Sequence, residues 1–325
     1  MKVKKEFILL FAVIIASALY LMFRTTDKIH YQLPGIPHIS KKEITRIEIS
    51  KADSSVVLKK KDAHWVIEPE GYPVDTGKIK NMLDVINGLT LTALVSESKN
   101  DYLYDLTDQK KITVKVFDGE SVKLEFEVGR AAPSWHHTFI RLAGDSRVYH
   151  AEGNFRDKFD LTADELYDKV VLSFNQKDIN EITLTKGKKS LTLVRKEIQK
   201  KTEKEKPKKD QPPQKQVETS WKTSDGSEVN MPVLKSILST LSDLRCKKYI
   251  DGKRKQDFRN PLYAVALKGV REFGLSIFKK SNGNADGYPA VSSANEYPFL
   301  LSDGQAKKIM RDFGDIVEKQ KKPQK

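Results

Sequence analysis

The stretch that decides the fold is residues 74–89, VDTGKIKNMLDVINGL, whose pattern returns 155 positions later as residues 229–244, VNMPVLKSILSTLSDL. In both stretches a short polar residue, Asp75 or Asn230, precedes apolar residues at helical spacing, as at the N-cap of an amphipathic helix. Val74 and Ile79 are spaced as a hydrophobic staple across the first turn, and the second copy repeats both positions. The two stretches therefore predict the same capped helix twice.

The duplication extends to both sides of this helix. The matching residues ahead of it are Ile44, Ile47, Ile49 and Lys51 against Ile179, Ile182, Leu184 and Lys186, at an offset of 135, and Trp65 against Trp221. The matching residues behind it are Val114, Val116, Leu124, Phe126, Val148 and Gly153 against Val265, Leu267, Leu275, Ile277, Phe299 and Gly304, at an offset of 151. Because apolar pattern and cap chemistry are what repeats, the duplication predicts a repeated fold and requires no repeated catalytic centre.

Each copy consists of short alternating strands around one helix, which predicts an α+β fold of mainly antiparallel sheet with helices on one face. The strands predicted for the first copy are Ile44–Ser50, Ser55–Lys60, His64–Glu68, Lys111–Phe117, Val122–Val128, Thr138–Leu142 and Arg147–Ala151. A short helix at Gly153–Phe159 closes this copy, and Val233–Leu244 and Gly304–Phe313 are the helices predicted for the second.

The predicted domains are residues 1–28 as a cytoplasmic tip and transmembrane anchor, 40–172 and 178–315 as the two repeat units, and 316–325 as a basic tail. The jump in offset places an insertion in the second unit, at residues 199–217. Its central run, residues 200–215, is rich in lysine and proline and has no apolar side chain to bury. This composition predicts a solvated, disordered loop that projects from a hairpin.

The N-terminus predicts a membrane anchor. Lys2, Lys4 and Lys5 precede the apolar run Phe7–Phe23, whose seventeen residues reach about 25 Å as a helix, near the lower limit for a bilayer span. The leading lysines place Met1 in the cytoplasm and the bulk of the chain outside the cytoplasmic membrane, in the periplasm. A cleaved signal peptide is the alternative, because Ala16-Ser17-Ala18 has the small-x-small form of a cleavage site. Both interpretations export the two units.

The net charge of +14 does not indicate nucleic-acid binding, because of where the charge lies. Residues 1–6, 200–215 and 319–325 carry +2, +4 and +4, so ten of the fourteen charges belong to an anchor flank, a loop and a tail. The repeat units are only mildly basic, and we expect no nucleic-acid partner. Cys246 is the single cysteine, so no intrachain disulfide forms and the exported units rely on their cores. We expect Cys246 to be a small buried residue.

The common motifs of enzymatic chemistry are absent from the sequence. The sequence has no GxxxxGK[ST] loop, no G-x-S-x-G elbow, no H-E-x-x-H motif and no cysteine pair for a metal. Trp135-His136-His137, with His150 nearby, is the sharpest metal candidate, but neighbouring strand residues point to opposite faces. The second copy has Asp286-Gly287-Tyr288 there. We therefore expect a surface loop, and no catalytic, cofactor-binding or metal residue is assigned.

Other aromatic and acidic residues have structural and functional interpretations side by side. Trp65 and Trp221 occupy the same position in both copies, which favours core anchors over ligand stacking. The tyrosines at 102, 104, 149 and 167 suit either a protein interface or ordinary packing. Asp101, Asp105 and Asp108 lack the glycine and terminal glutamate of a calcium loop, so turn formation is expected.

The chain resembles a known family, domain of unknown function 4340. The resemblance is carried by His64-Trp65-Val66-Ile67, Tyr72-Pro73-Val74-Asp75, the Tyr-x-Leu element Tyr104-Asp105-Leu106, and Phe126-Glu127-Val128-Gly129. It covers most of residues 40–170 and the second copy more loosely, and Asp105 stands where the family usually has glycine. Proteins of this kind are often accompanied by an ABC-2 type exporter permease, its ATPase and a gliding-motility auxiliary protein. The resemblance therefore implies an accessory role at an envelope transporter.

These observations together predict a non-enzymatic, membrane-anchored scaffold or accessory protein whose partners are the membrane and an ABC-type permease or auxiliary subunit. A lipid- or glycan-binding module is the first alternative and requires an apolar or aromatic cleft. A hydrolase is the second and requires converging polar side chains with shifted ionisation.

Overall fold

The structure, a computed structural model, describes residues 5–23, 31–98, 100–199, 217–280 and 286–318. The predicted insertion falls on residues 200–216 and most of the predicted tail on residues 319–325, which lie outside the described residues. Helix α1 (Lys5–Phe23) covers the apolar run at the N-terminus. Over the described residues, no helix is both long and apolar enough to cross a membrane.

The strands and helices that the sequence predicts for the first repeat occur in the predicted order. The observed elements are β1 (Arg46–Lys51), β2 (Ser54–Lys61), β3 (His64–Glu68), β4 (Tyr72–Pro73), α2 (Thr76–Asn87), β5 (Leu91–Ser96), the 3₁₀ helix η1 (Asp101–Tyr104), β6 (Ile112–Asp118), β7 (Ser121–Ala131), β8 (His137–Leu142), β9 (Val148–Glu152) and α3 (Arg156–Phe159). Of these, β4, β5 and η1 are additional to the predicted elements. The sequence predicts that the closing helix begins at Gly153, but α3 begins at Arg156, because the φ of 93° at Gly153 is incompatible with a helix.

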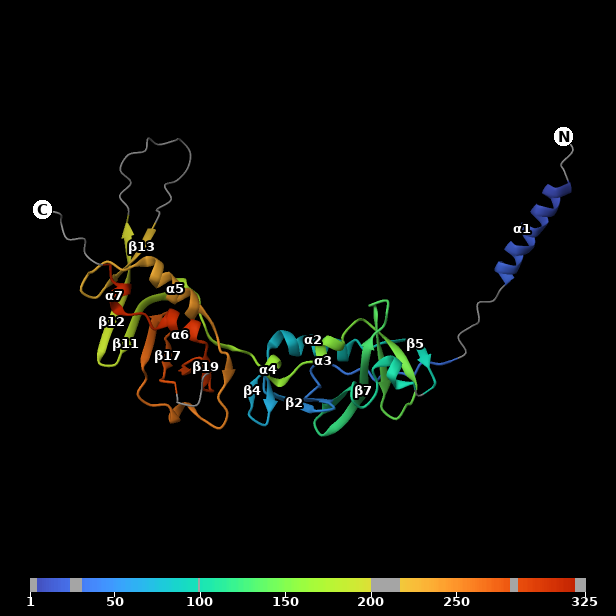
Figure 1. Ribbon diagram of the computed structural model, residues 1–325, viewed down its shortest axis with the longest axis horizontal. Coiled ribbons are helices and arrows are strands. Elements are labelled where there is room, and N and C mark those ends of the chain that lie inside the picture. Colours follow the sequence, from blue (N-terminus) through green and yellow to red (C-terminus); the bar gives the residue numbers. More distant parts are fainter. Residues whose placement is uncertain (1–4, 24–30, 99, 200–216, 281–285, 319–325) are drawn as a thin grey trace. The chain divides into compact units, whose positions relative to one another are not determined.

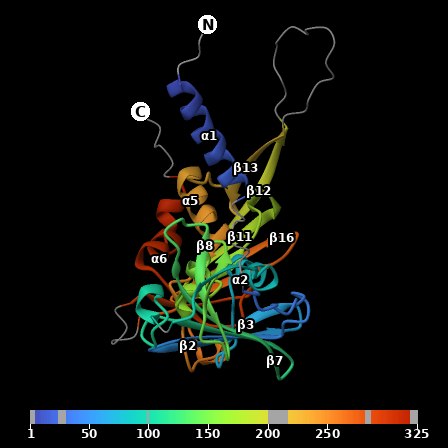
Figure 2. The same ribbon diagram turned by 90° about the vertical axis from the view of Figure 1, so that its right-hand side faces the viewer.

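The second repeat follows after a short connection. Its elements are α4 (Ala163–Leu166), β10 (Val170–Ser173), η2 (Gln176–Asp178), β11 (Ile179–Lys186), β12 (Lys189–Gln199), β13 (Val217–Thr223), α5 (Met231–Ser242), β14 (Asp243–Arg245), β15 (Lys248–Tyr249), η3 (Lys255–Asp257), β16 (Tyr263–Gly269), β17 (Phe273–Ile277), β18 (Tyr288–Ser292), β19 (Phe299–Leu301), α6 (Asp303–Ile309) and α7 (Phe313–Ile316). The predicted hairpin that carries the insertion is confirmed, because β12 pairs with β13 up to Gln199 and Val217 (Figure 2).

Two predicted helices differ from those observed. Asn230 caps α5 as predicted, since its side chain accepts a hydrogen bond from the Val233 amide. However, α5 ends before Leu244, because β14 instead pairs with β10 and places Leu244 opposite Leu172. The single helix predicted at Gly304–Phe313 is two helices, α6 and α7, and the capping box of Ser302 starts the first of them.

Strand order confirms the duplication. The first sheet belongs to the blue-to-green part of the chain and the second to the yellow-to-red part (Figure 1). The first sheet has the order β4-β3-β2-β1-β6-β7-β8-β9-β5, and the second has β13-β12-β11-β16-β17-β18-β19-β15. Once the short strand β4 is set aside, the two orders correspond strand for strand, and neighbouring strands such as β1 with β2 and β11 with β16 are antiparallel. The chain is thus an α+β protein with two large, mostly antiparallel sheets.

Residue pairing corrects one part of the sequence alignment. Val114 pairs with Phe126, whereas its equivalent Val265 pairs with Leu275, so Leu275 stands in the place of Phe126. The sequence alignment matched Phe126 to Ile277 instead. The difference arises because the hairpin between β6 and β7 is two residues longer than the hairpin between β16 and β17.

The chain divides into two compact units whose limits differ from those of the repeats. The first unit comprises residues 1–65 and 77–162, and the second comprises residues 66–76 and 163–325. The second unit also continues past residue 315, because Ile316 is fully buried and Val317 forms a bridge with Val229. The predicted basic tail therefore begins later than residue 316.

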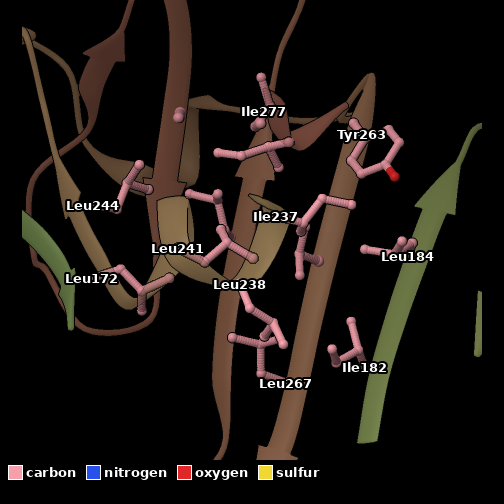
Figure 3. Packing of buried hydrophobic residues seen from close by; sticks show 14 of the residues in the cluster. Leu172, Ile182, Leu184, Ile237, Leu238, Leu241, Leu244, Tyr263, Leu267 and Ile277 are labelled. Atoms are coloured by element: carbon pink, nitrogen blue, oxygen red, sulfur yellow. The ribbon is translucent and has the colours of Figure 1, made fainter. Parts of the chain in front are cut away.

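The core of the second unit lies between α5 and its sheet (Figure 3). Leu234, Ile237, Leu238 and Leu241 form the buried face of α5. They pack in one cluster with strand residues such as Leu267. Each such side chain contributes about 1.5–3 kcal/mol when fully buried, so the helix is held by its apolar face. In the first unit, α2 buries Ile79, Met82 and Ile86 at the positions that helical spacing predicts.

Candidate functional site

The 3₁₀ turn η1, between β5 and β6, divides its apolar residues between core and solvent. Tyr102 and Leu103 are 74% and 49% exposed. Leu106 is fully buried in a small cluster with Phe139, and Tyr104 packs against the same cluster. Tyr104 and Leu106 thus anchor the turn in the core, whereas Tyr102 and Leu103 are presented to solvent. We call Tyr102 and Leu103 the apolar tip.

The backbone of this turn explains two of the family motifs. Asp105 adopts a left-handed conformation, with a φ of 55°, which glycine adopts without strain and aspartate tolerates. Gly129 has no room for a side chain, because a Cβ atom there would lie 2.2 Å from the Tyr104 carbonyl oxygen. The glycine of Phe126-Glu127-Val128-Gly129 therefore allows β7 to approach the turn closely.

Two arginines fix the turn from the neighbouring strands. Arg141 on β8 donates to Asp101 at 2.8 Å and to Glu127 at 2.6 Å, and its side chain is only 14% exposed. Arg130 on β7 donates from Nε to the Leu103 carbonyl oxygen at 2.7 Å. A partly buried ion pair and a charge-assisted hydrogen bond thus hold the apolar tip in one orientation.

The loop between β7 and β8, together with the first residue of β8, carries the exposed indole of Trp135. The Trp135 amide donates to the Ala132 carbonyl at 2.9 Å, which closes a turn with Pro133 at its second position. Trp135 follows in a left-handed conformation, with a φ of 60°, and is 71% exposed. We call residues 132–137 the Trp135 loop.

Shallow hollows lie on both sides of Trp135. The first, of ≈ 670 Å³, is lined by Arg130, Pro133, Arg156 and Asp157 among others. The second, of ≈ 610 Å³, is lined by Thr92, His136, His137, Glu152 and Gly153. Trp135 and Asn154 border both hollows. Both volumes fall in the range of small-molecule sites, and both linings mix one aromatic ring with polar groups.

The three histidines that suggested a metal do not form a ligand set. His137 and His150 stack with ring centroids 5.2 Å apart, and burial together with the charge of His137 lowers the pKa of His150. His136 belongs to the Trp135 loop, and its carbonyl accepts a hydrogen bond from the Gly153 amide. Within the described ranges, no three His, Cys, Asp or Glu side chains are grouped as metal ligands. The structure places His136 in the surface loop that the sequence predicts.

Tyr149 is a packing residue and not an interface residue. It is fully buried, and its hydroxyl donates to Asp145 at 2.6 Å. Burial and this hydrogen bond raise the pKa of Tyr149 to about 12. Hydrogen bonds from Arg147 and Tyr149 hold the pKa of the Asp145 carboxyl well below its usual range. The group is a local clamp at the turn before β9.

Four tyrosines form a cluster within the second unit. Tyr72, from the segment 66–76, stacks on Tyr249 at 4.7 Å and meets Tyr167 and Tyr297 edge to face. The Tyr72 hydroxyl donates to Asp251 at 2.7 Å, and burial is the main cause that raises its pKa. Tyr167 is thus part of a structural cluster, which leaves Tyr102 as the exposed member of the four tyrosines considered for an interface.

The remaining sequence candidates occupy structural positions. Trp65 and Trp221 are 9% and 6% exposed, which confirms them as core residues. Cys246 is buried, and burial raises the pKa of its thiol to about 12. Asp101 begins η1, as expected for a turn residue, and Asp108 pairs with Lys111 at 2.6 Å.

Sequence reasoning missed the contrast between Trp135 and the other two tryptophans. Trp135 was considered only with its histidine neighbours, as a metal candidate. Pro133, two residues ahead, signals a turn, and the residue after such a turn in a hairpin is commonly left-handed. A bulky residue at this position is unusual, and that signal was available in the sequence.

Two antiparallel sheets with the same strand order define a class of duplicated α+β proteins. The family model described as domain of unknown function (DUF4340) matches residues 65–261, which is more than half of the chain. The chain belongs to this family. No curated protein and no solved structure matched it.

Proposed function

We propose that this chain is a non-enzymatic accessory protein of an envelope transport system, anchored in the cytoplasmic membrane and exposed on its outer side. Its two units act by contact, as a scaffold for an ABC-type permease or an auxiliary subunit. The proposed anchor is the apolar run Phe7–Phe23, which follows three lysines. The family resemblance suggests the class of partner. The proposed contact surface lies on the first unit.

The observation that carries the scaffold proposal is the apolar tip. Tyr102 and Leu103 are adjacent, largely exposed and located on a turn that Arg141 and Arg130 hold through backbone and carboxylate contacts. Tyrosine is enriched at protein interfaces, and a preordered tip loses little entropy on binding. The tip is also adjacent to the Tyr-x-Leu element of the family, so the element has a role in presenting it.

Site-specific photo-crosslinking tests this surface in cells that produce the protein naturally. A photoreactive phenylalanine analogue replaces Tyr102, and the matched control carries it at Val122, which is 50% exposed in the same unit. We expect a crosslink to a permease or auxiliary subunit from position 102, and its loss when Leu103→Asp is added. Equal products from both positions, or no protein product from position 102, would refute the proposed contact.

The proposed topology has its own test. Protease added to cells with a permeabilised outer envelope should digest the two units, while the chain stays in the membrane fraction after carbonate washing. Mass spectrometry of the N-terminus then separates an anchor from a cleaved signal peptide. Protection of the units from protease would contradict their export.

A further inference from the structure

Trp135 differs from the other tryptophans of the chain in its surroundings. Trp65 and Trp221 are buried in the two cores, whereas the indole of Trp135 is 71% exposed. An isolated exposed apolar residue is common on protein surfaces and needs no function. Exposure alone therefore assigns no function to Trp135, whereas its backbone and its neighbours do distinguish it.

The backbone holds Trp135 in a conformation that disfavours it. With a φ of 60°, Trp135 occupies the left-handed region, where glycine or asparagine is usual and a bulky residue is an outlier. The side chain is too exposed for packing to account for this conformation. Strained positions of this kind cluster at binding sites, where the surrounding structure fixes them.

The surrounding structure does fix the Trp135 loop. The Ala132 amide donates to the His137 carbonyl at 2.8 Å, and the Gly153 amide donates to the His136 carbonyl at 2.8 Å. The hydroxyl of Thr138, which is fully buried, donates to the Gly153 carbonyl at 2.8 Å. The loop and the segment beside it are therefore joined before any ligand arrives, which limits the entropy lost on binding.

The groups around the indole suit hydroxyl-rich ligands. An amide from Asn154, a carboxylate from Glu152 and an imidazole from His136 line the hollows beside Trp135. Together these planar groups donate and accept hydrogen bonds, as paired sugar hydroxyls require. The flat indole is apolar, as is the C–H face of a pyranose ring, so the two surfaces can stack.

Charge argues against an anionic ligand or an anionic membrane at this surface. Arg156 lies 3.6 Å from Asp160, and both line the first hollow together with Asp157. Arg130 also lines the first hollow, so two arginines there are matched by two carboxylates, and the second hollow adds the carboxylate of Glu152. A phosphate or a layer of anionic head groups would meet these carboxylates.

We propose that the Trp135 loop and its two hollows form a binding site for an oligosaccharide. One pyranose ring stacks on Trp135, and Asn154, Glu152 and His136 hydrogen-bond the hydroxyls of that sugar and its neighbours. This inference goes beyond the scaffold proposal and does not depend on it. It gives the first unit a sugar ligand, in addition to any protein partner.

Intrinsic fluorescence provides the first test. Acrylamide should quench Trp135 and leave the two buried tryptophans largely unquenched. The probes are hexasaccharides of β-1,4-linked N-acetylglucosamine, β-1,4-linked glucose and α-1,4-linked glucose, each at ~1 mM, a concentration that detects weak affinities. The full chain is kept in a detergent without a sugar head group, which would compete. We expect at least one hexasaccharide to protect Trp135 from quenching.

Calorimetry then measures sugar binding without relying on tryptophan fluorescence. Trp135→Gly should weaken binding of that hexasaccharide about tenfold or more, since truncated tryptophans commonly carry such losses. Trp135→Tyr should retain part of the affinity, and Asn154→Ala should weaken binding without changing the tryptophan. The proposal is overturned if no hexasaccharide protects Trp135, if anionic phosphatidylglycerol vesicles alone protect it, or if Trp135→Gly binds as tightly as the natural chain.

The scaffold proposal and the glycan proposal fail independently. Trp135→Gly leaves the apolar tip intact, so a crosslink from position 102 should persist in that variant. Leu103→Asp should remove the crosslink while sugar binding in calorimetry is unchanged.

Discussion

Replacement of Trp135 by glycine tests whether this residue is kept for binding or for packing. About 29% of the side chain is buried, which is ~70 Å² of a ~250 Å² tryptophan, so truncation loses about 1.8 kcal/mol. Relief of the left-handed conformation returns about 1–2 kcal/mol. The extra freedom of glycine in the unfolded chain costs about 0.5–1 kcal/mol. We expect a net destabilisation of about 0.3–1.8 kcal/mol.

Hydrogen exchange of peptides from β7 and β8, read by mass spectrometry, measures this change in the first unit alone. That readout requires neither a tryptophan signal nor two-state unfolding of both units. The matched control is Trp65→Ala, which removes a core residue and should cost about 3–5 kcal/mol. A loss above about 2 kcal/mol for Trp135→Gly would show that the indole packs, and would refute this reasoning.

Three further substitutions or treatments have expected outcomes. Gly129→Ala should destabilise the first unit by about 1–3 kcal/mol in thermal unfolding, because its Cβ would collide with backbone, whereas Gly304→Ala has open space and should be neutral or slightly stabilising. Asp145→Asn should cost about 1 kcal/mol at pH 7. Because the folded-state pKa of Asp145 lies below its ordinary value of ~3.9, this penalty should shrink in urea titrations as the pH falls below about 4, and a penalty that is constant with pH would contradict the proposed ion pair. Cys246, whose thiol pKa is raised by burial, should resist iodoacetamide at pH 8 in the native chain and react in urea, so rapid native labelling would contradict its burial.

Much of the fold could be predicted because the decisive patterns are local and occur twice. Alternation of apolar residues located the strands, and Asn230 marked the start of α5. Because the pattern occurs in both copies, the assignment of an element in one copy is supported by the same assignment in the other. Helix ends were less predictable, because β14 pairs with a distant strand and so removes Leu244 from the helical pattern that it fits.

Long-range packing explains what the sequence could not show. The order of strands depends on pairings between residues far apart, such as Ile47 with Val116. The grouping of segment 66–76 with the second unit depends on Tyr72, whose ring contacts tyrosines more than 90 residues away. No local pattern distinguishes Tyr72 from an ordinary strand residue.

The candidate surfaces were only partly predictable for a related reason. Tyr102 was one of several tyrosines with no feature to separate them, and exposure singled it out. The exposure of Trp135 arises from a left-handed turn residue, which the sequence signals only through Pro133. The fold places both residues near Arg130, which donates to Leu103 and lines the hollow beside Trp135.

The central claim is that the exported units act by contact with a transport system. Its most direct test is mild crosslinking in cells, followed by purification of the full chain in detergent and mass spectrometry of the proteins that come with it. The control is a chain limited to residues 1–40, which keeps the apolar run and lacks both units. We predict that a permease or its auxiliary subunit is recovered with the full chain and not with the control. Recovery of the same proteins with both chains, or of no transport component with the full chain, would contradict the claim.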